Sequence, residues 1–371
     1  MRILVTGGAG FVGSHLVDAL VGRGERVRVL DSLEPQVHGA ARARPAYLHP
    51  DAELVVGDVR DREVLARALD GVEVVFHQAA AVGVGQSMYE IERYVSVNSL
   101  GAAVLLEEIV RRRERIRKLL VASSMSIYGE GAYRDARGAV VHPELRPEQQ
   151  LRARRFELED AEGRPLTPTP TPETKPLQPT SIYAVTKRDH EEMFLAVGAA
   201  YRIPTVALRY FNIYGTRQSL SNPYTGVIAI FSSRLLNRRP PLVFEDGRQT
   251  RDFVHVSDVV RANLAALDSD AANGRVYNVG TGAPTSVLQV AELLAKELGF
   301  PEPPEVTQQY RAGDVRHCVA DASRIARELD FRARTTLADG MRELLDWLRR
   351  QSPEDRVEQA ARELAERGLT R

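Results

Sequence analysis

Short apolar runs alternate with amphipathic stretches along the first 125 residues of the chain. The runs are rich in Val, Ile and Leu and occupy residues 3–5, 27–30, 54–56, 72–76 and 118–122. The stretches between them repeat apolar residues at helical spacing, most clearly over 12–21, 63–69 and 98–113. Strands that alternate with helices in this way predict a parallel sheet covered by helices on both faces. Because these strands are almost continuously apolar, we expect a doubly wound α/β fold of Rossmann type.

The alternation stops between Gly131 and Pro179, where polar and charged residues dominate. A Thr-Pro repeat at the end of this segment predicts an extended, polyproline-like stretch from Thr167 to Pro172. A helix is predicted over 183–200, a strand over 205–210 and a charged amphipathic helix over 354–367. We therefore expect three parts: a first α/β domain over 1–205 that carries the insert 131–179, a smaller α/β domain mainly over 206–350 with some strands returning to the first sheet, and a helical tail over 351–371.

Composition narrows the class of protein. The 371 residues are 43% hydrophobic, and Lys and Arg together number 50 against 50 Asp and Glu. Zero formal charge argues against a nucleic-acid partner. The single cysteine, Cys318, excludes a disulfide framework and a multi-thiolate zinc site. No apolar run approaches the ~20 residues that cross a bilayer, and the chain opens into Met1-Arg2-Ile3 without a signal peptide. We expect a cytoplasmic protein with no membrane partner and no metal.

A glycine-rich turn follows the first predicted strand and precedes the first predicted helix. Gly7, Gly10 and Gly13 allow the backbone to approach a pyrophosphate, which then binds at the helix N-terminus. Asp31 ends the second strand, 18 residues after Gly13. A carboxylate at this position accepts the ribose hydroxyls and repels a 2′-phosphate, so the predicted cofactor is NAD rather than NADP. Further predicted cofactor contacts are Phe11, Val12, Ser32, Asp58, Val59, Ala79, Ala80 and Ala81.

Tyr183 and Lys187 stand four residues apart on a predicted helix, so they project from one face of it. An ammonium group and the nicotinamide charge nearby lower the pKa of a phenol, which can then act as a general base. The sequence Ser181-Ile-Tyr183-Ala-Val-Thr-Lys187, together with the glycine spacing, resembles the extended short-chain dehydrogenase/reductase family. The resemblance covers about residues 1–345.

The resemblance implies further roles. Ser124, in the segment Ala122-Ser-Ser-Met-Ser-Ile-Tyr128, takes the position of the catalytic serine, and Lys187 that of the lysine on the nicotinamide ribose. Asn98 matches the family's structural asparagine on the helix before the strand 118–122, and we place it with the cofactor site. Family members dimerise through a four-helix bundle, which implies a homodimer built from helices near 98–113 and 183–200.

Met125 and Ser126 separate the branches of this family. The dehydratases carry an Asp-Glu pair at these two positions, and the decarboxylating relatives keep a glutamate at the second. Neither is present, so the chain resembles the epimerase branch, in which a nucleoside-diphosphate sugar is oxidised and reduced at C4. The resemblance also implies that Asn212, Arg251 and Arg311 bind the diphosphate, that Asp314 binds the ribose, and that Ser123 and Ser126 contact the sugar.

The insert suggests the substrate. Some bacterial epimerases that act on dTDP-L-rhamnose carry an insert here with cysteine pairs that resemble a zinc ribbon. This chain has Asp135, Arg137, Asp160 and Glu162 in those neighbourhoods, so we expect a metal-free insert. The expected substrate is dTDP-L-rhamnose or another dTDP-hexose. The alternatives, in order, are a UDP-glucuronate or UDP-glucose 4-epimerase, a nucleotide-sugar 4-ketoreductase, and a dinucleotide sensor without catalysis.

Overall fold

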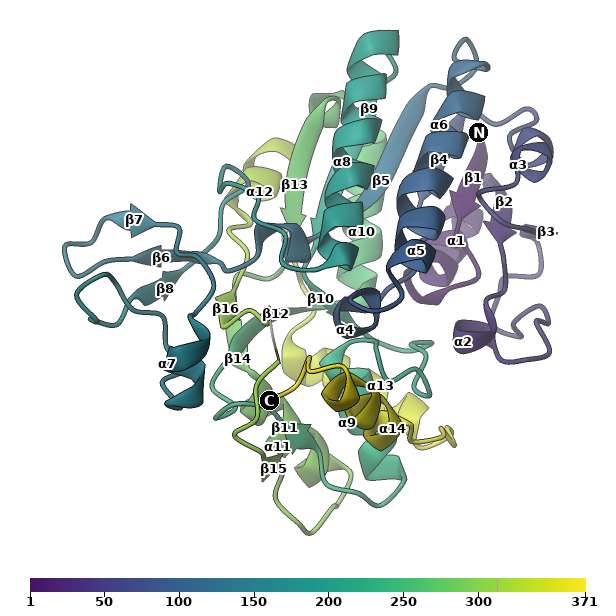
Figure 1. Ribbon diagram of the computed structural model, residues 1–371. Coiled ribbons are helices and arrows are strands. Elements are labelled where there is room, and N and C mark those ends of the chain that lie inside the picture. The colour runs from purple at the N-terminus through teal and green to yellow at the C-terminus, as the bar shows by residue number, and fades with distance from the viewer. Residues whose placement is uncertain (312) are drawn as a thin grey trace.

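A seven-stranded parallel sheet forms the larger half of the computed structural model, which describes residues 1–311 and 313–371 (Figure 1). Its order is β13-β9-β5-β4-β1-β2-β3. The strands are β1 (Arg2–Thr6), β2 (Arg26–Asp31), β3 (Glu53–Val56), β4 (Val74–His77), β5 (Lys118–Ser124), β9 (Thr205–Tyr210) and β13 (Arg275–Val279). Each expected strand lies within two residues of an observed one, and the predicted doubly wound fold is confirmed. Two of the seven strands, β9 and β13, come from the second half of the chain.

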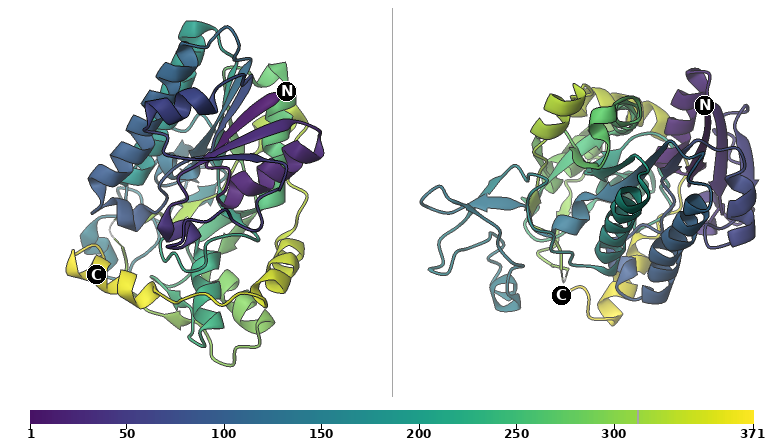
Figure 2. Two further views of the ribbon diagram at one scale, coloured as in Figure 1. Left: turned by 90° about the vertical axis from the view of Figure 1, so that its right-hand side faces the viewer. Right: turned by 90° about the horizontal axis from the view of Figure 1, so that it is seen from above.

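Helices cover both faces of this sheet (Figures 1 and 2). One face carries α3 (Arg62–Ala68), α6 (Gly101–Val110) and α8 (Ile182–Tyr201), and the other carries α1 (Phe11–Gly22), α10 (Val256–Asp268) and α12 (Ser323–Leu329). Strand β5 contributes side chains to the apolar cores on both faces of the sheet. Leu119 and Val121 pack with the first group of helices, whereas Leu120 and Ala122 pack with the second. This is the period of two that a sheet buried on both faces requires.

Several shorter elements lie at the carboxyl ends of the strands. They are α2 (Pro35–His38), α4 (Val84–Ser87), α5 (Ile91–Tyr94), the π-helical turn Val95–Leu100 and the 3₁₀ turn Met125–Tyr128. A second 3₁₀ turn covers Asp270–Ala272. The first turn of α6 continues the π-helical turn, so the helix expected over 98–113 begins earlier and ends at Val110.

The second, smaller core lies below the carboxyl edge of the large sheet in Figure 1. Its helices are α9 (Val227–Leu236), α11 (Val287–Glu297) and α13 (Leu337–Leu348), which share one apolar cluster. Its strands are β10 (Asn212–Tyr214), β12 (Thr250–His255), β14 (Pro284–Ser286), β16 (His317–Cys318), β11 (Leu242–Val243) and β15 (Glu305–Val306). Only Phe211 separates β9 from β10, so the chain passes directly from one sheet to the other.

The insert folds as a small sheet that projects from the body of the molecule (Figures 1 and 2). It contains β6 (Ala132–Arg134), β7 (Val140–Val141), α7 (Glu148–Arg152) and β8 (Thr167–Thr169), with strand order β7-β6-β8. The Thr-Pro repeat is extended as expected, but the polyproline-like assignment was wrong for β8, which pairs with β6. The pairing is possible because β8 is an edge strand, where Pro168 needs no ladder hydrogen bond on its outer side.

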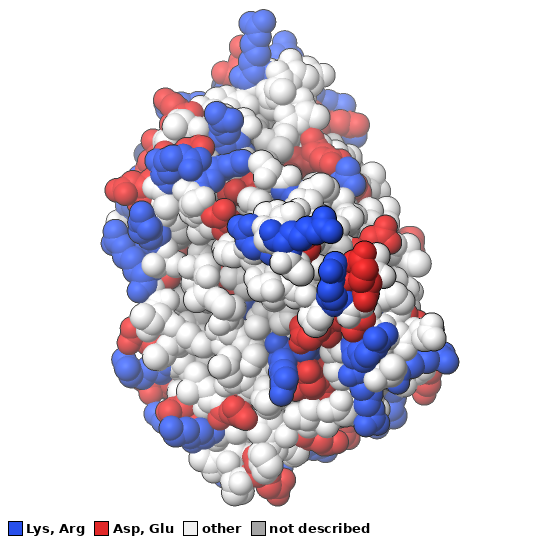
Figure 3. Space-filling model, turned by 90° about the vertical axis from the view of Figure 1, so that its left-hand side faces the viewer, with Lys and Arg blue, Asp and Glu red and all other residues white. Residues whose placement is uncertain are grey.

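The chain ends in α14 (Val357–Glu366), which buries Ala360 and Leu364. Within the described ranges, no helix is long and apolar enough to span a membrane. On the face that carries the insert, acidic and basic side chains are interspersed, with no broad region of one sign (Figure 3).

Candidate active site

The glycine-rich turn has the geometry that a dinucleotide requires. Gly7 has a φ of +67°, and a Cβ there would lie 2.7 Å from the Ala79 nitrogen. A Cβ on Gly13 would lie 2.2 Å from the Gly7 oxygen. At this turn the backbones of β1, β4 and the start of α1 therefore pack too closely for any residue larger than glycine. Helix α1 begins at Phe11, so the free N–H groups of its first turn are available to a phosphate.

Asp31 lies at the carboxyl end of β2, against this turn. Its carboxylate accepts hydrogen bonds from the Ala9 nitrogen at 3.0 Å and the Leu33 nitrogen at 2.9 Å. Each carboxylate oxygen keeps a further lone pair, so the residue fits a ribose diol. The Asp58 carboxylate is bound by the Arg60 side chain, at 2.6 Å for the closest pair. The remaining predicted contacts at this edge of the sheet are partly exposed: Phe11, Val12, Ser32, Ala79, Ala80 and Ala81.

Two predicted cofactor residues point into the protein. Asn98 is fully buried, and its side-chain amide bonds the Ala81 nitrogen and oxygen and the Thr186 hydroxyl. Because all its polar atoms are used within the protein, Asn98 supports the 79–81 segment and does not itself face a ligand. Val59 is also buried and packs against Gly101, so only its backbone can reach a cofactor.

Ser124, Tyr183 and Lys187 come together where β5 ends and α8 begins. The Ser181 hydroxyl caps α8 by accepting from the Ala184 nitrogen at 3.1 Å, which fixes the first turn of the helix and Tyr183 with it. The Ser124 oxygen accepts from the backbone nitrogen of Ser126 at 3.2 Å and from its hydroxyl at 2.9 Å. A hydroxyl with both lone pairs occupied has its own proton left to donate.

The pKa values of Tyr183 and Lys187 differ from the expectation. Burial raises the pKa of Tyr183 to about 12, while the neighbouring Ser124 hydroxyl acts in the opposite direction. Burial also lowers the pKa of Lys187 to about 7. In the protein alone, burial opposes the lowered phenol pKa that we expect, and the combined effect of the ammonium and the nicotinamide charge stays a prediction.

Ser123 does not reach the sugar site. Its side chain is buried and donates to Glu191 at 2.7 Å, and Glu191 forms a buried ion pair with Arg209. The assignment of Ser123 as a substrate contact was wrong. Glu191 follows Lys187 by four residues, so it lies on the same face of α8 one turn further along.

The predicted diphosphate residues lie together. Asp314 accepts from Arg251 at 3.3 Å and from Arg311 at 2.9 Å, and Arg311 also stacks on Phe244 at 4.8 Å. Although burial opposes it, the charges of Arg311 and Arg251 lower the pKa of Asp314. The side-chain oxygen of Asn212 is buried and has no hydrogen-bond partner among residues 1–311 and 313–371. The cluster thus holds two positioned guanidinium groups, of which that of Arg251 already donates from both terminal nitrogens to Asp314 and to three backbone carbonyls. It also holds one amide oxygen, that of Asn212, without a partner among the described residues.

The insert is joined to this cluster by buried charges. Arg146 donates to Glu245 and to the Asp314 carbonyl, and the fully buried Arg316 pairs with Glu157 and Glu245. At the far end of the insert, two turns are closed by aspartates. Asp135 accepts from the nitrogens of Arg137 and Ala139, and Asp160 accepts from those of Glu162 and Arg164.

Sequence reasoning missed two supports of the catalytic loop. Ser87 of α4 accepts from the Tyr183 nitrogen at 3.0 Å. Lys175, at the end of the insert, is buried and donates to the Tyr128 carbonyl at 2.9 Å. Lysine is rare in this chain, and that rarity was the available signal for Lys175. For Ser87 we found no signal in the sequence.

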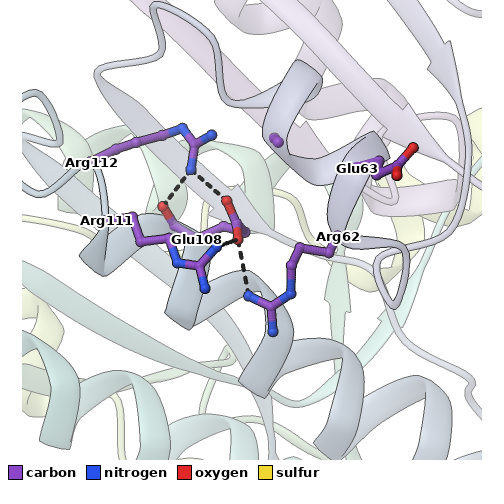
Figure 4. Close-up of a pocket in the computed structure, with 6 residues that line it drawn as sticks. Arg62, Glu63, Glu108, Arg111 and Arg112 are labelled. Atoms are coloured by element: carbon purple, nitrogen blue, oxygen red, sulfur yellow. Dashed lines mark hydrogen bonds and ion pairs between the residues drawn. The ribbon is translucent and has the colours of Figure 1, made fainter.

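A separate charged pocket lies between α3 and α6, and none of the predicted site residues lines it. The buried Glu108 carboxylate accepts there from Arg62, Arg111 and Arg112 (Figure 4). Burial opposes ionisation, but these arginines lower the pKa of Glu108. The three guanidinium groups are thus held by a carboxylate, and we assign the pocket no ligand.

Comparisons with known proteins agree with this geometry. Residues 3–150 and 159–280 match the model of the NAD dependent epimerase/dehydratase family. The dTDP-L-rhamnose 4-epimerase of Burkholderia thailandensis is 38% identical over 349 residues, which span 94% of each chain. The UDP-glucose 4-epimerase of Thermotoga maritima, solved with UDP-glucose, superposes with a TM-score of 0.77 at 31% identity and covers 94% of this chain and 99% of its own. The UDP-glucuronic acid 4-epimerase of Bacillus cereus, solved with UDP-glucuronic acid and NAD, gives 0.75 at 26% identity with the same coverage.

Fold and sequence place the protein in the class of extended short-chain dehydrogenases/reductases, which are NAD-dependent enzymes with a Rossmann-type sheet. More narrowly, the chain belongs to the NAD-dependent epimerase/dehydratase family.

Proposed function

We propose that the protein is an NAD-dependent 4-epimerase of a nucleoside-diphosphate sugar, with dTDP-L-rhamnose or another dTDP-hexose as substrate. The observation that carries the proposal is the meeting of Ser124, Tyr183 and Lys187 at the edge of β5 and α8, with no further acid or base at Met125 and Ser126. The 38% identity to a dTDP-L-rhamnose 4-epimerase supports the choice of sugar.

The chain supplies proton transfer and orientation. NAD, when bound, supplies a reversible two-electron exchange with C4 of the sugar. The Tyr183 phenol oxygen removes the proton of the C4 hydroxyl and later returns it. The Ser124 hydroxyl, whose lone pairs are occupied by Ser126, donates to the same sugar oxygen. Lys187 lies one helical turn beyond Tyr183, where it can bind the nicotinamide ribose.

The sugar must present both faces of C4 while the nucleotide stays in place. Arg251 and Arg311 would bind the diphosphate oxygens, and Asn212 would donate from its amide. The Asp314 carboxylate, whose pKa is lowered by the two arginines, stays ionised at neutral pH and suits a ribose diol. An anchor at the diphosphate leaves the sugar free to turn about the C1–O and O–P bonds that join it to the β-phosphate.

UDP-glucuronate is the second candidate, because one observation favours it. The Ser126 hydroxyl lies beside Ser124 and is partly exposed, so it can donate to a sugar carboxylate if it gives up its hydrogen bond to Ser124. Met125, by contrast, is 9% exposed and packs with Tyr128 and Phe211, which offers an apolar wall to a 6-methyl group. We prefer the deoxyhexose because a carboxylate also calls for a cationic partner, and the nearest predicted cations, Arg251 and Arg311, are assigned to the diphosphate.

The Tyr183→Phe variant tests the proposal. Without the phenol oxygen, turnover should fall at least about a thousandfold, while NAD content stays at the wild-type level because Phe preserves the ring. Tyr201→Phe, at the exposed end of the same helix, is the matched control and should be indistinguishable from wild type. Near-wild-type turnover in Tyr183→Phe would refute the assignment of the base.

We also propose that the enzyme is a homodimer formed through α6 and α8. Val185 of α8 is 40% exposed, and Leu100, the residue directly before α6, is 51% exposed. Val95, in the π-helical turn before α6, is 44% exposed. Apolar side chains that gather on two adjacent helices are typical of a subunit interface. A second copy of the chain would cover them as a four-helix bundle.

The cytoplasm is the compartment that we propose. Cys318 is a free, buried thiol, and burial raises its pKa to about 12. A chain with one cysteine has no need of an oxidising compartment.

A further inference from the structure

The last twenty residues of the chain, 352–371, have no part in the reaction steps above, yet they contact three regions around the site. We call this segment the C-terminal strap. It begins on the smaller core, where the Glu354 nitrogen donates to the Ser221 hydroxyl at 3.0 Å and Asn237 donates to the Pro353 carbonyl at 2.9 Å. Asp355 is buried between Arg234 and Arg239 of this region.

The middle of the strap, α14, is held by two tyrosines. Glu363 accepts from the Tyr89 hydroxyl at 3.0 Å and from the Tyr224 hydroxyl at 2.9 Å. Arg367 stacks on the Tyr89 ring at 4.3 Å. Leu364, which is buried, covers Gly85 of α4 closely enough that a Cβ on the glycine would lie 3.4 Å from it. The helix therefore packs on α4 and on Tyr89 in the segment that follows it.

Helix α4 is in turn the support of the catalytic tyrosine. The Ser87 hydroxyl accepts from the Tyr183 nitrogen and donates to the Val84 carbonyl at 2.7 Å. Only Gln86 separates Ser87 from Gly85, on which Leu364 packs. A chain of direct contacts thus runs from α14 through α4 to the first turn of α8.

The end of the strap reaches the diphosphate cluster. The Tyr310 and Arg371 backbones exchange two hydrogen bonds, of 2.9 and 3.0 Å, and Arg311 forms an antiparallel bridge with Thr370. The Arg371 side chain pairs with Glu148 of the insert helix α7. The backbone of Arg311, one of the two predicted phosphate ligands, is therefore fixed by the last residues of the chain.

We propose that the C-terminal strap is a positioning element of the sugar-nucleotide site, which sets the distance between the Arg311 anchor and Tyr183. The proposal rests on the proposed function, since it assigns the diphosphate to Arg311 and the proton transfer to Tyr183. A sugar that turns about a fixed diphosphate can return its C4 to the same phenol only if anchor and base keep their separation. Small displacements of reacting groups cost large factors in rate.

Two variants of the full enzyme test the two ends of the strap separately. Deletion of residues 369–371 removes the pairing with Tyr310 and Arg311, and should raise KM for the nucleotide sugar about tenfold with kcat within about twofold. Glu363→Ala removes the acceptor of both tyrosines, and should lower kcat about fivefold through α4. Glu363→Gln keeps an acceptor oxygen and should restore kcat. Glu366→Ala, exposed on the same helix, is the control.

The outcomes distinguish the strap from the proposed function. If the truncated protein and Glu363→Ala both keep the wild-type KM and kcat, the positioning role of the strap is refuted and the epimerase assignment stands. A joint fall in NAD content, melting temperature and kcat, with KM unchanged, would show a merely structural tail and would also overturn it. Wild-type enzyme that turns over neither dTDP-L-rhamnose nor UDP-glucuronate would overturn the proposed function, and the role of the strap with it.

Discussion

Ser123 follows Leu119 and Val121 on the face of β5 that α8 covers, and this placement decides what the residue does. Its hydroxyl donates to the buried Glu191 carboxylate, whereas Ser126, three residues later, donates to Ser124. Two serines that are near neighbours in the chain thus serve different purposes. Ser123 stabilises the ion pair of Glu191 with Arg209, and Ser126 orients the catalytic hydroxyl.

Ser123→Ala and Ser126→Ala should therefore have opposite effects. Ser123→Ala removes a hydrogen bond to a buried charge and should lower the free energy of unfolding by about 2 kcal/mol, with KM within about twofold. Ser126→Ala should leave stability nearly unchanged and lower kcat about fivefold, because Ser124 loses one of its two donors. Urea unfolding and steady-state kinetics measure both. A raised KM with unchanged stability in Ser123→Ala would restore the sugar contact that we withdraw.

Lys187 links stability to pH. Burial lowers its pKa from 10.5 to about 7, so between these values the unfolded chain binds more protons than the folded protein. Stability therefore rises with pH in this window, by roughly 1.4 kcal/mol per unit for this one group. From pH 7 to pH 9, wild type should gain about 2 kcal/mol relative to Lys187→Met. The measurement is urea unfolding of both proteins after removal of bound nucleotide, and a constant difference across the two pH values would contradict the buried, weakly basic lysine.

The positions of some side chains relative to one another can be predicted from the sequence alone. Tyr183 and Lys187 could be placed together because a helix fixes the relation of residues four apart. Ser123 could not be placed correctly, because the orientation of its side chain depends on Glu191 of α8, a helix that begins 59 positions further along the chain at Ile182.

At the scale of elements, the large sheet could be predicted because its strands carry continuous apolar runs and its helices a clear periodicity. The insert could not, since its few apolar side chains give no period. Tyr133, Leu158 and Leu166 form its small core. The insert is attached to the smaller domain by an apolar cluster of Leu151, Phe156 and Tyr310, by backbone hydrogen bonds and by buried charges. The fully buried Arg316 is the centre of these charges, with carboxylates of Glu157, Glu245 and Asp246 around its guanidinium group.

Arg316→Met should destabilise the protein by about 3 kcal/mol, because carboxylates that were paired with the guanidinium group are left partly buried without it. Arg342→Met is the matched control. Arg342 pairs with Asp339 at 3.2 Å on the exposed side of α13, where an ion pair contributes no more than about 0.5 kcal/mol. Denaturant unfolding of the two variants measures the difference. Equal losses would mean that the insert is not held by its buried charges.

At the scale of the whole molecule, the tail brings together parts that are remote in the sequence. Glu363 and Tyr89 are 274 positions apart, and their contact joins the end of the chain to the first domain. Composition and periodicity identified a charged amphipathic helix here but contain no information on its partner. The same limit applies to the diphosphate cluster, whose members could be proposed from family resemblance and whose proximity appears only in the folded chain.

The central claim is that the protein inverts C4 of a nucleotide sugar with NAD that it already holds. A proton NMR time course of the purified protein with dTDP-L-rhamnose and no added cofactor tests it most directly. The account predicts loss of the starting H4 signal and growth of a new signal whose coupling belongs to the inverted centre. Unchanged spectra with dTDP-L-rhamnose and also with UDP-glucuronate, from protein shown to contain NAD, would contradict the assignment of the chain as a 4-epimerase.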